Sequence, residues 1–150
     1  MDVAAALWGG IVGAIVMATV YAGFVGLGLT RLDLLRFEGG LLARDTTMMV
    51  YIYGAVFQIA LGAVLALGYR YAFEQIHSAT YVGWGALIGL GQGVLLALAL
   101  PLLGKLNRNV RAGDDGEPGF AGRRYGRLTP AALLVGCMVF GVWVGAFLLP

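Results

Sequence analysis

Four long apolar stretches divide the chain, over residues 3–29, 48–69, 81–103 and 130–149. A helix needs about 20 apolar residues to cross the bilayer core, and each stretch is long enough. The stretches are continuous, whereas the strands of a membrane β-barrel would alternate apolar and polar residues over about 10 positions. The pattern therefore predicts an all-α membrane protein, a four-transmembrane-helix bundle that forms one integral membrane domain over residues 1–150.

Composition supports this class. The 150 residues are 60% hydrophobic and 12% charged, whereas a soluble domain carries about 25% charged residues. A soluble protein of this composition would expose an implausible apolar surface. The first stretch follows the acidic Asp2 and is longer than the apolar region of about 7–15 residues in a cleavable signal peptide. We therefore expect it to remain as a membrane span.

Basic residues predict the orientation in the membrane, because Lys and Arg concentrate in cytoplasmic loops. Of the ten Lys and Arg residues, Arg70 alone falls in the second loop. The first and third loops hold the others, Arg31, Arg36, Arg44, Lys105, Arg108, Arg111, Arg123, Arg124 and Arg127. We therefore expect these two loops to be cytoplasmic and both termini to lie outside. Topology and anionic lipid headgroups explain the basic loops, so no nucleic acid partner is implied.

Small residues recur every four positions in all four predicted spans. Such rows form ridges along which two helices can approach closely within a lipid environment. The predicted helix-packing positions are Gly10, Ala14, Gly54, Gly62, Gly85, Gly89, Gly93, Gly141 and Gly145. The rows predict tight helix packing, either within the chain or against another subunit.

The two halves of the chain also show a faint correspondence. Trp8 in the first span matches Trp84 in the third, and Gly62 in the second matches Gly145 in the fourth. This indicates either two parallel helical-hairpin repeats about an axis along the membrane normal or a coincidence of composition.

Two glutamines form a candidate midplane polar pair. Gln58 lies near the middle of the second span and Gln92 near the middle of the third. The short second loop suggests that these spans are neighbours, and an amide in hydrocarbon needs a hydrogen-bonding partner. We favour a bond between the two amides that holds the helices together, because Gly93 beside Gln92 belongs to a packing row. The alternative is that both amides line a solute site, since polar groups within membranes often mark substrate paths.

The remaining polar residues suggest little chemistry. No Asp, Glu, Lys or Arg falls within a predicted hydrocarbon core. The single cysteine, Cys137, and the single histidine, His77, are too few for a cysteine-based metal site or two axial haem ligands. We expect no cofactor, no metal site and no enzymatic activity. The first loop, RLDLLRFEGGLLARD, either lies along the membrane surface or is a folded-back turn broken at the glycine pair 39–40.

The chain resembles an uncharacterised family of small four-span bacterial membrane proteins, known as a domain of unknown function. The likeness rests on RLDLL at Arg31, GLGQG around Gln92, LPLL around Pro101, YGRLTP from Tyr125, and the GxxxGAF that begins at Gly141. The resemblance implies a four-helix fold in the bacterial inner membrane. The family often has histidines at the positions of residues 92 and 137, so a metal or haem role does not carry over to this sequence.

Two functions follow as expectations. The first is a structural or accessory subunit, packed through its small-residue faces into a homo-oligomer or a larger membrane complex. The second is a small transporter or channel whose solute site lies at Gln58 and Gln92. The lipid bilayer is the one partner that both functions share.

Overall fold

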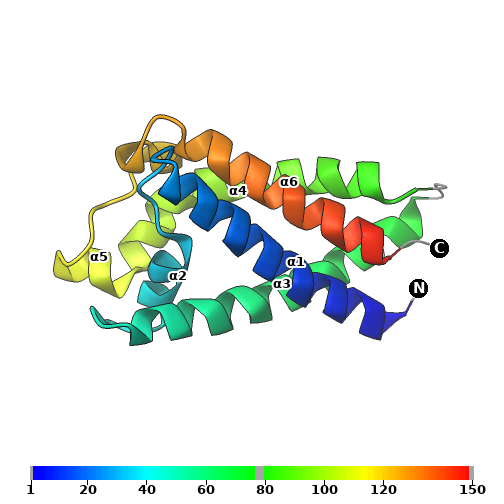
Figure 1. The fold of residues 1–150 in the computed structure, drawn as a ribbon, viewed down its shortest axis with the longest axis horizontal. Coiled ribbons are helices and arrows are strands. Elements are labelled where there is room, and N and C mark those ends of the chain that lie inside the picture. Colours follow the sequence, from blue (N-terminus) through cyan, green and yellow to red (C-terminus); the bar gives the residue numbers. More distant parts are fainter. Residues whose placement is uncertain (1, 77–79, 149–150) are drawn as a thin grey trace.

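The structure, a computed structural model, describes residues 2–76 and 80–148, and every regular element in that part is helical. Four long helices run the length of the molecule, and shorter helices gather at one end (Figure 1). In chain order the elements are α1 (Val3–Gly26), α2 (Leu34–Leu42), α3 (Met49–Gln75), α4 (Val82–Leu106), α5 (Arg108–Ala112), the 3₁₀ segment η1 (Phe120–Tyr125) and α6 (Thr129–Phe147).

The helices α1, α3, α4 and α6 are each long and apolar enough to cross a membrane. Each begins within one residue of its predicted start. Helix α3 extends beyond its predicted end to Gln75, so Arg70 and Glu74 lie on the helix, where their side chains form an ion pair at 2.8 Å. Helix α4 continues through Pro101 to Leu106. Both chain ends lie at the end of the bundle opposite α2 and α5, here called the terminal end and the loop end (Figure 1).

Glycines allow the long helices to pack backbone against backbone. Helix α4 packs along α6, and α1 packs against both α3 and α6. A Cβ atom added at Gly85 would overlap the carbonyl oxygen of Gly141, and one added at Gly141 would overlap that of Gly85. Helices α1 and α3 meet in the same way at Gly10 and Gly62. The row on α4 therefore faces α6, and the chain's own helices fill these close contacts.

The first loop forms helix α2, so the expected alternative of a folded-back turn broken at the glycine pair 39–40 is wrong. Helix α2 runs through Gly39 and its neighbour without a break, and it packs along the first turns of α3. A Cβ atom at Gly39 would overlap the carbonyl oxygen of Val50, and one at Gly54 would overlap that of Leu35. The two glycines thus belong to a close helix–helix contact. They do not end the helix, because tertiary packing compensates for their low helix propensity.

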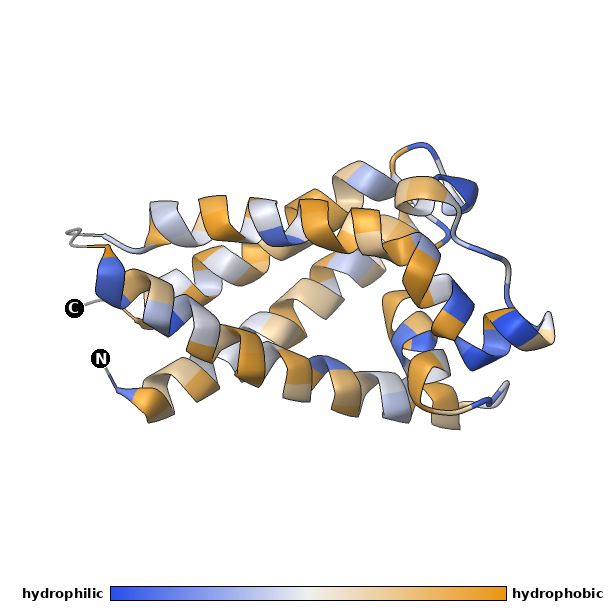
Figure 2. Ribbon diagram, turned by 180° about the vertical axis from the view of Figure 1, so that it is seen from behind, coloured by the Kyte–Doolittle hydropathy of each residue, from blue (hydrophilic) through white to orange (hydrophobic). Residues whose placement is uncertain are grey.

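Polar side chains at the loop end hold α2 in place. Buried Asn107 donates a hydrogen bond from Nδ2 to the carbonyl oxygen of Phe37 at 2.7 Å. Its Oδ1 accepts from the backbone N–H groups of Asn109 and Val110 in the first turn of α5. Arg36 on α2 forms an ion pair with Asp115 at 2.7 Å. Hydrophilic residues gather at this end, whereas the long helices are largely apolar (Figure 2). Through the Arg36–Asp115 ion pair, the acidic segment 114–117 connects the third loop to α2.

Candidate functional site

A buried carboxyl group lies beside Gln58. The side chain of Gln58 on α3 faces that of Glu38 on α2, and these residues are only 6% and 7% exposed. With the amide nitrogen turned toward the carboxylate, Nε2 donates to Oε1 at 2.6 Å and to Oε2 at 3.0 Å. Helix α2 thus brings an acidic side chain to the side of a predicted membrane span.

Glu38 is an acidic residue inside the bundle, which the sequence pattern did not predict. The four apolar stretches contain no charged residue in their cores, and Glu38 was assigned to a loop. Because α2 packs against α3, this loop residue is instead buried among the long helices. Burial raises the pKa of the Glu38 carboxyl to about 8, since the charged form loses its hydration. The group can therefore hold or release a proton near neutral pH.

Gln92 has partners other than Gln58. Its Oε1 accepts a hydrogen bond from the hydroxyl of Tyr69 at 2.9 Å, and its Nε2 lies 3.9 Å from the sulfur of Cys137. Within residues 2–76 and 80–148, no hydrogen bond joins the two glutamines. The predicted direct bond is replaced by two separate pairs, Gln58 with Glu38 and Gln92 with Tyr69. The second pair still joins α4 to α3, although the two helices otherwise pack mainly on other helices.

The weak contact between α3 and α4 leaves a cavity of about 330 Å³. Its polar side chains are Glu38, Gln58 and Gln92. The rest of its wall is apolar and consists of Ala14, Met17, Leu61, Gly62, Leu65, Leu95, Leu96, Ala99 and Phe140. The predicted glutamine pair therefore shares one cavity, although the two amides do not bond each other. The structure adds a carboxyl group to the site.

A second cavity, of about 390 Å³, lies between α1 and α3 and is also lined by Gln58. Ala14 lines both cavities, and the remaining wall of the second includes Thr19 and Leu35. The Gln58 side chain therefore borders two spaces on different sides of α3.

The chemistry available to the site is hydrogen bonding and proton binding. An amide and a carboxyl group can bind a polar or charged part of a small molecule, and the apolar wall can bind its hydrophobic part. Among the described residues, no three His, Cys, Asp or Glu side chains cluster in a way that could hold a metal ion. His77 lies outside the described residues.

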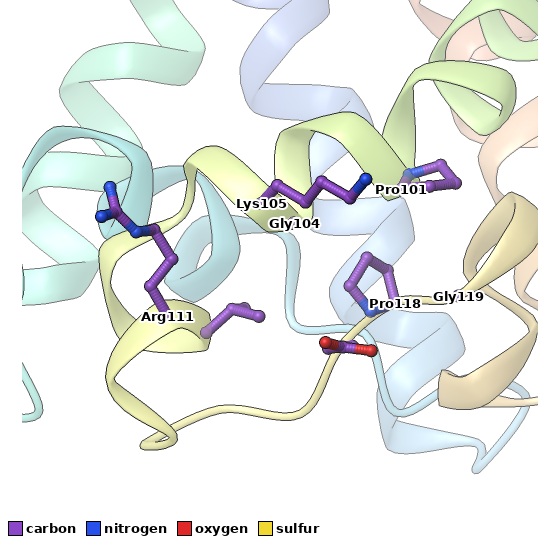
Figure 3. Close-up of a pocket in the computed structure, with 8 residues that line it drawn as sticks. Pro101, Gly104, Lys105, Arg111, Pro118 and Gly119 are labelled. Atoms are coloured by element: carbon purple, nitrogen blue, oxygen red, sulfur yellow. The ribbon is translucent and has the colours of Figure 1, made fainter.

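A pocket of about 350 Å³ at the loop end contains two basic side chains, Lys105 and Arg111. Figure 3 shows Lys105 reaching toward Pro101 and Arg111 extending in another direction, so their charges do not converge on one point. The nearby carboxylate of Glu117 pairs with Arg124 at 2.6 Å. This arrangement is a weaker candidate for a specific site than the cavity at Glu38.

Sequence reasoning missed Glu38 because the segment around it is too short to span a membrane and contains several charges. The sequence did contain one indication that this segment packs against the second span. Glu38 is followed by two glycines, and Gly54 precedes Gln58 by four residues on a predicted span. Small residues on both segments permit close packing, which would have allowed α2 to approach α3.

Comparison with known proteins adds no relative. No protein-family model, curated protein or solved structure matches the chain. The resemblance to a family of four-span bacterial proteins therefore remains a prediction.

Proposed function

We propose that this protein is a small multi-pass membrane transporter whose solute binds in the cavity between α3 and α4. The observation that carries the proposal is Glu38, a buried carboxyl group that lines a largely apolar cavity. A buried charged or polar group is costly to retain within a membrane and commonly marks a substrate path. The site has three polar members, Glu38, Gln58 and Gln92.

The cavity that borders the other side of Gln58 supports transport over static binding. A solute has to reach the site from one side of the membrane and leave on the other. Gln58 and Ala14 line both cavities, so a rearrangement of the Gln58 side chain would alter the wall between them. This makes the Glu38–Gln58 pair a suitable position for a gate.

An accessory subunit is the second candidate. Its support is the last part of α1, where the small residues Ala22 and Gly26 are both exposed. A partner or second copy could pack there. Most of the other row positions, including Gly85 and Gly141, are already filled by contacts within the chain, so we rank this candidate below transport.

We further propose that the loop end faces the cytoplasm of a bacterial cell, with both termini outside the inner membrane. The support is the bias of Lys and Arg toward the first and third loops. Reporter fusions after residue 148 should show the outer side, and fusions at Gly116 should show the cytoplasm. A cytoplasmic reporter signal from the C-terminal fusion would contradict this orientation.

Water access to the cavity tests the transporter proposal. In a Cys137→Ala background, Leu96→Cys places a thiol in the cavity wall, and Leu98→Cys places one on an exposed face of the same helix. A thiol needs water to ionise and react, so the neutral reagent 2-hydroxyethyl methanethiosulfonate should label position 96 at least about tenfold faster than position 98. Mass spectrometry of protein in liposomes measures both rates.

The same assay also tests from which side of the membrane the reagent reaches the cavity. Glutathione does not cross the bilayer and consumes the reagent, so it should slow labelling of Leu96→Cys when it is placed on either side of the liposome. A rate at position 96 no faster than at position 98 would mean that the cavity is dry and has no solute path. Protection by glutathione from one side only would favour a one-sided pocket and would contradict transport.

A further inference from the structure

We propose that the solute is a monovalent organic cation with an apolar body, and that it exchanges with the proton of Glu38. This inference rests on the proposed function and names its substrate class. It is carried by the charge of the site, the two orientations of the Gln58 amide and the composition of the cavity wall.

Among the described residues, no basic side chain pairs with Glu38. On α2 itself, Arg36 is bound to Asp115, and the Asp33 carboxylate accepts from the backbone N–H of Arg36. The other polar groups in the cavity wall are the neutral amides of Gln58 on α3 and Gln92 on α4. Behind the wall, Gln92 is bonded to the phenol of Tyr69 on α3 and lies near the thiol of Cys137 on α6, and the phenol of Tyr21 on α1 is buried outside the wall. An ionised Glu38 would therefore lack a counter-ion.

A buried carboxyl without a counter-ion has two neutral arrangements, which are protonation or the binding of a cation. Burial raises its pKa to about 8, so the proton occupies the site at neutral pH. When a monovalent cation enters, the carboxyl O–H bond breaks, the proton passes to water, and the carboxylate pairs with the cation. One positive charge leaves as one enters, so the net charge of the cavity does not change.

The Gln58 amide can form a hydrogen bond with Glu38 both when the carboxyl group is ionised and when it is protonated. Its nitrogen donates to a carboxylate at 2.6 and 3.0 Å. Turned over, its oxygen lies at the same position and accepts a hydrogen bond from a protonated carboxyl group. In either orientation the Gln58 amide therefore gives the Glu38 carboxyl group a hydrogen-bonding partner, and rotation of this amide accompanies the exchange of proton for cation.

The cavity wall selects an organic cation over a metal ion. A metal ion such as Ca²⁺ takes 6–8 oxygen ligands. The cavity offers fewer, from the Glu38 carboxyl, the Gln58 amide and the Gln92 oxygen, which also accepts a hydrogen bond from Tyr69. The aromatic ring of Phe140 and the apolar side chains of the wall suit a cation with hydrophobic substituents.

A pair of isosteric probes tests the inference. Phenyltrimethylammonium and tert-butylbenzene share one shape and differ by one positive charge. Titration calorimetry of the protein in detergent at pH 7 should show the cation binding at least about tenfold more tightly than the neutral probe. In buffers of different ionisation enthalpy, it should show release of about one proton per cation bound. Cation affinity should fall about tenfold for each pH unit below the pKa of Glu38.

Glu38→Gln keeps the shape of the side chain and its hydrogen bonding but removes the titrating charge. It should weaken cation binding at least about tenfold, abolish proton release and leave binding of tert-butylbenzene unchanged. Glu117→Gln is the matched control, since that carboxylate lies exposed at the loop end, and it should bind both probes as the parent does.

Four results would overturn the inference. These are equal affinity for the two probes, cation binding without proton release, cation binding unaffected by Glu38→Gln, and no binding of either probe. If Glu38→Gln does not fold, the proton count and pH dependence of the parent decide the question. In the first three cases rapid labelling at position 96 would leave the transporter proposal standing, whereas absence of both labelling and binding would remove it as well.

Discussion

Gly85→Ala is expected to destabilise the protein by about 2–3 kcal/mol or more. The added Cβ would overlap the carbonyl oxygen of Gly141 on α6. Overpacking of a tight contact costs about 1–3 kcal/mol, and a backbone atom in a helix cannot move aside as a flexible side chain can. Helices α4 and α6 would have to separate along much of their shared length. Titration of the protein in mixed micelles with sodium dodecyl sulfate measures the free energy of unfolding.

Gly91→Ala is the matched control on the same helix. No atom outside its own stretch of helix lies within 4 Å of a Cβ added there. Replacing glycine by alanine in a helix interior contributes up to about 1 kcal/mol of stability. The two identical substitutions, six residues apart on α4, should therefore change stability in opposite directions. A similar effect at both positions would mean that the α4–α6 contact does not exist as described.

The parent protein should lose stability as pH rises from about 5 to about 8, and Glu38→Gln should remove most of that loss. In the folded state burial raises the pKa of Glu38 from 4.5 to about 8. Between these values the unfolded chain releases a proton that the folded chain keeps. Stability therefore falls with rising pH, on the order of 1 kcal/mol for each pH unit in the steepest part, and levels off above the folded pKa.

Melting temperatures of both proteins in detergent, measured in steps from pH 5 to pH 9, check this expectation. Glutamine at position 38 can still bond Gln58 and does not titrate, so the difference between the two curves reports the carboxyl group. Glu117→Gln should follow the parent curve. Parallel curves for the parent and Glu38→Gln would show that Glu38 is ionised or solvated in the folded protein, and would remove the basis for proton exchange.

Several features of the candidate site could be predicted from the sequence. Gln58 and Gln92 stood out because amides are costly in hydrocarbon, and both do line the cavity between α3 and α4. Their hydrogen-bonding partners could not be predicted in this way. The short connection between α3 and α4 suggested that these two helices pack on each other. The glycines of α4 instead allow it to pack closely on α6, and Gly62 allows α3 to pack closely on α1.

The sequence by itself determined the all-helical class and the four apolar helices, because both depend on local properties. A run of about 20 apolar residues is long enough to span a bilayer whatever its neighbours are. The start of each long helix was predicted within one residue for the same reason.

Only the tertiary structure decided what lies inside the bundle. Helix α2 is short, charged and rich in glycine, so local rules placed it at the surface. Its position against α3 comes from contacts with residues distant in sequence, such as Gly54 beside Leu35 and Asn107 beside Phe37. These contacts carry Glu38 to Gln58 and create the buried carboxyl. Burial is a property of the packed molecule, so the pattern of residues along one segment could not show that this acid lies among apolar helices.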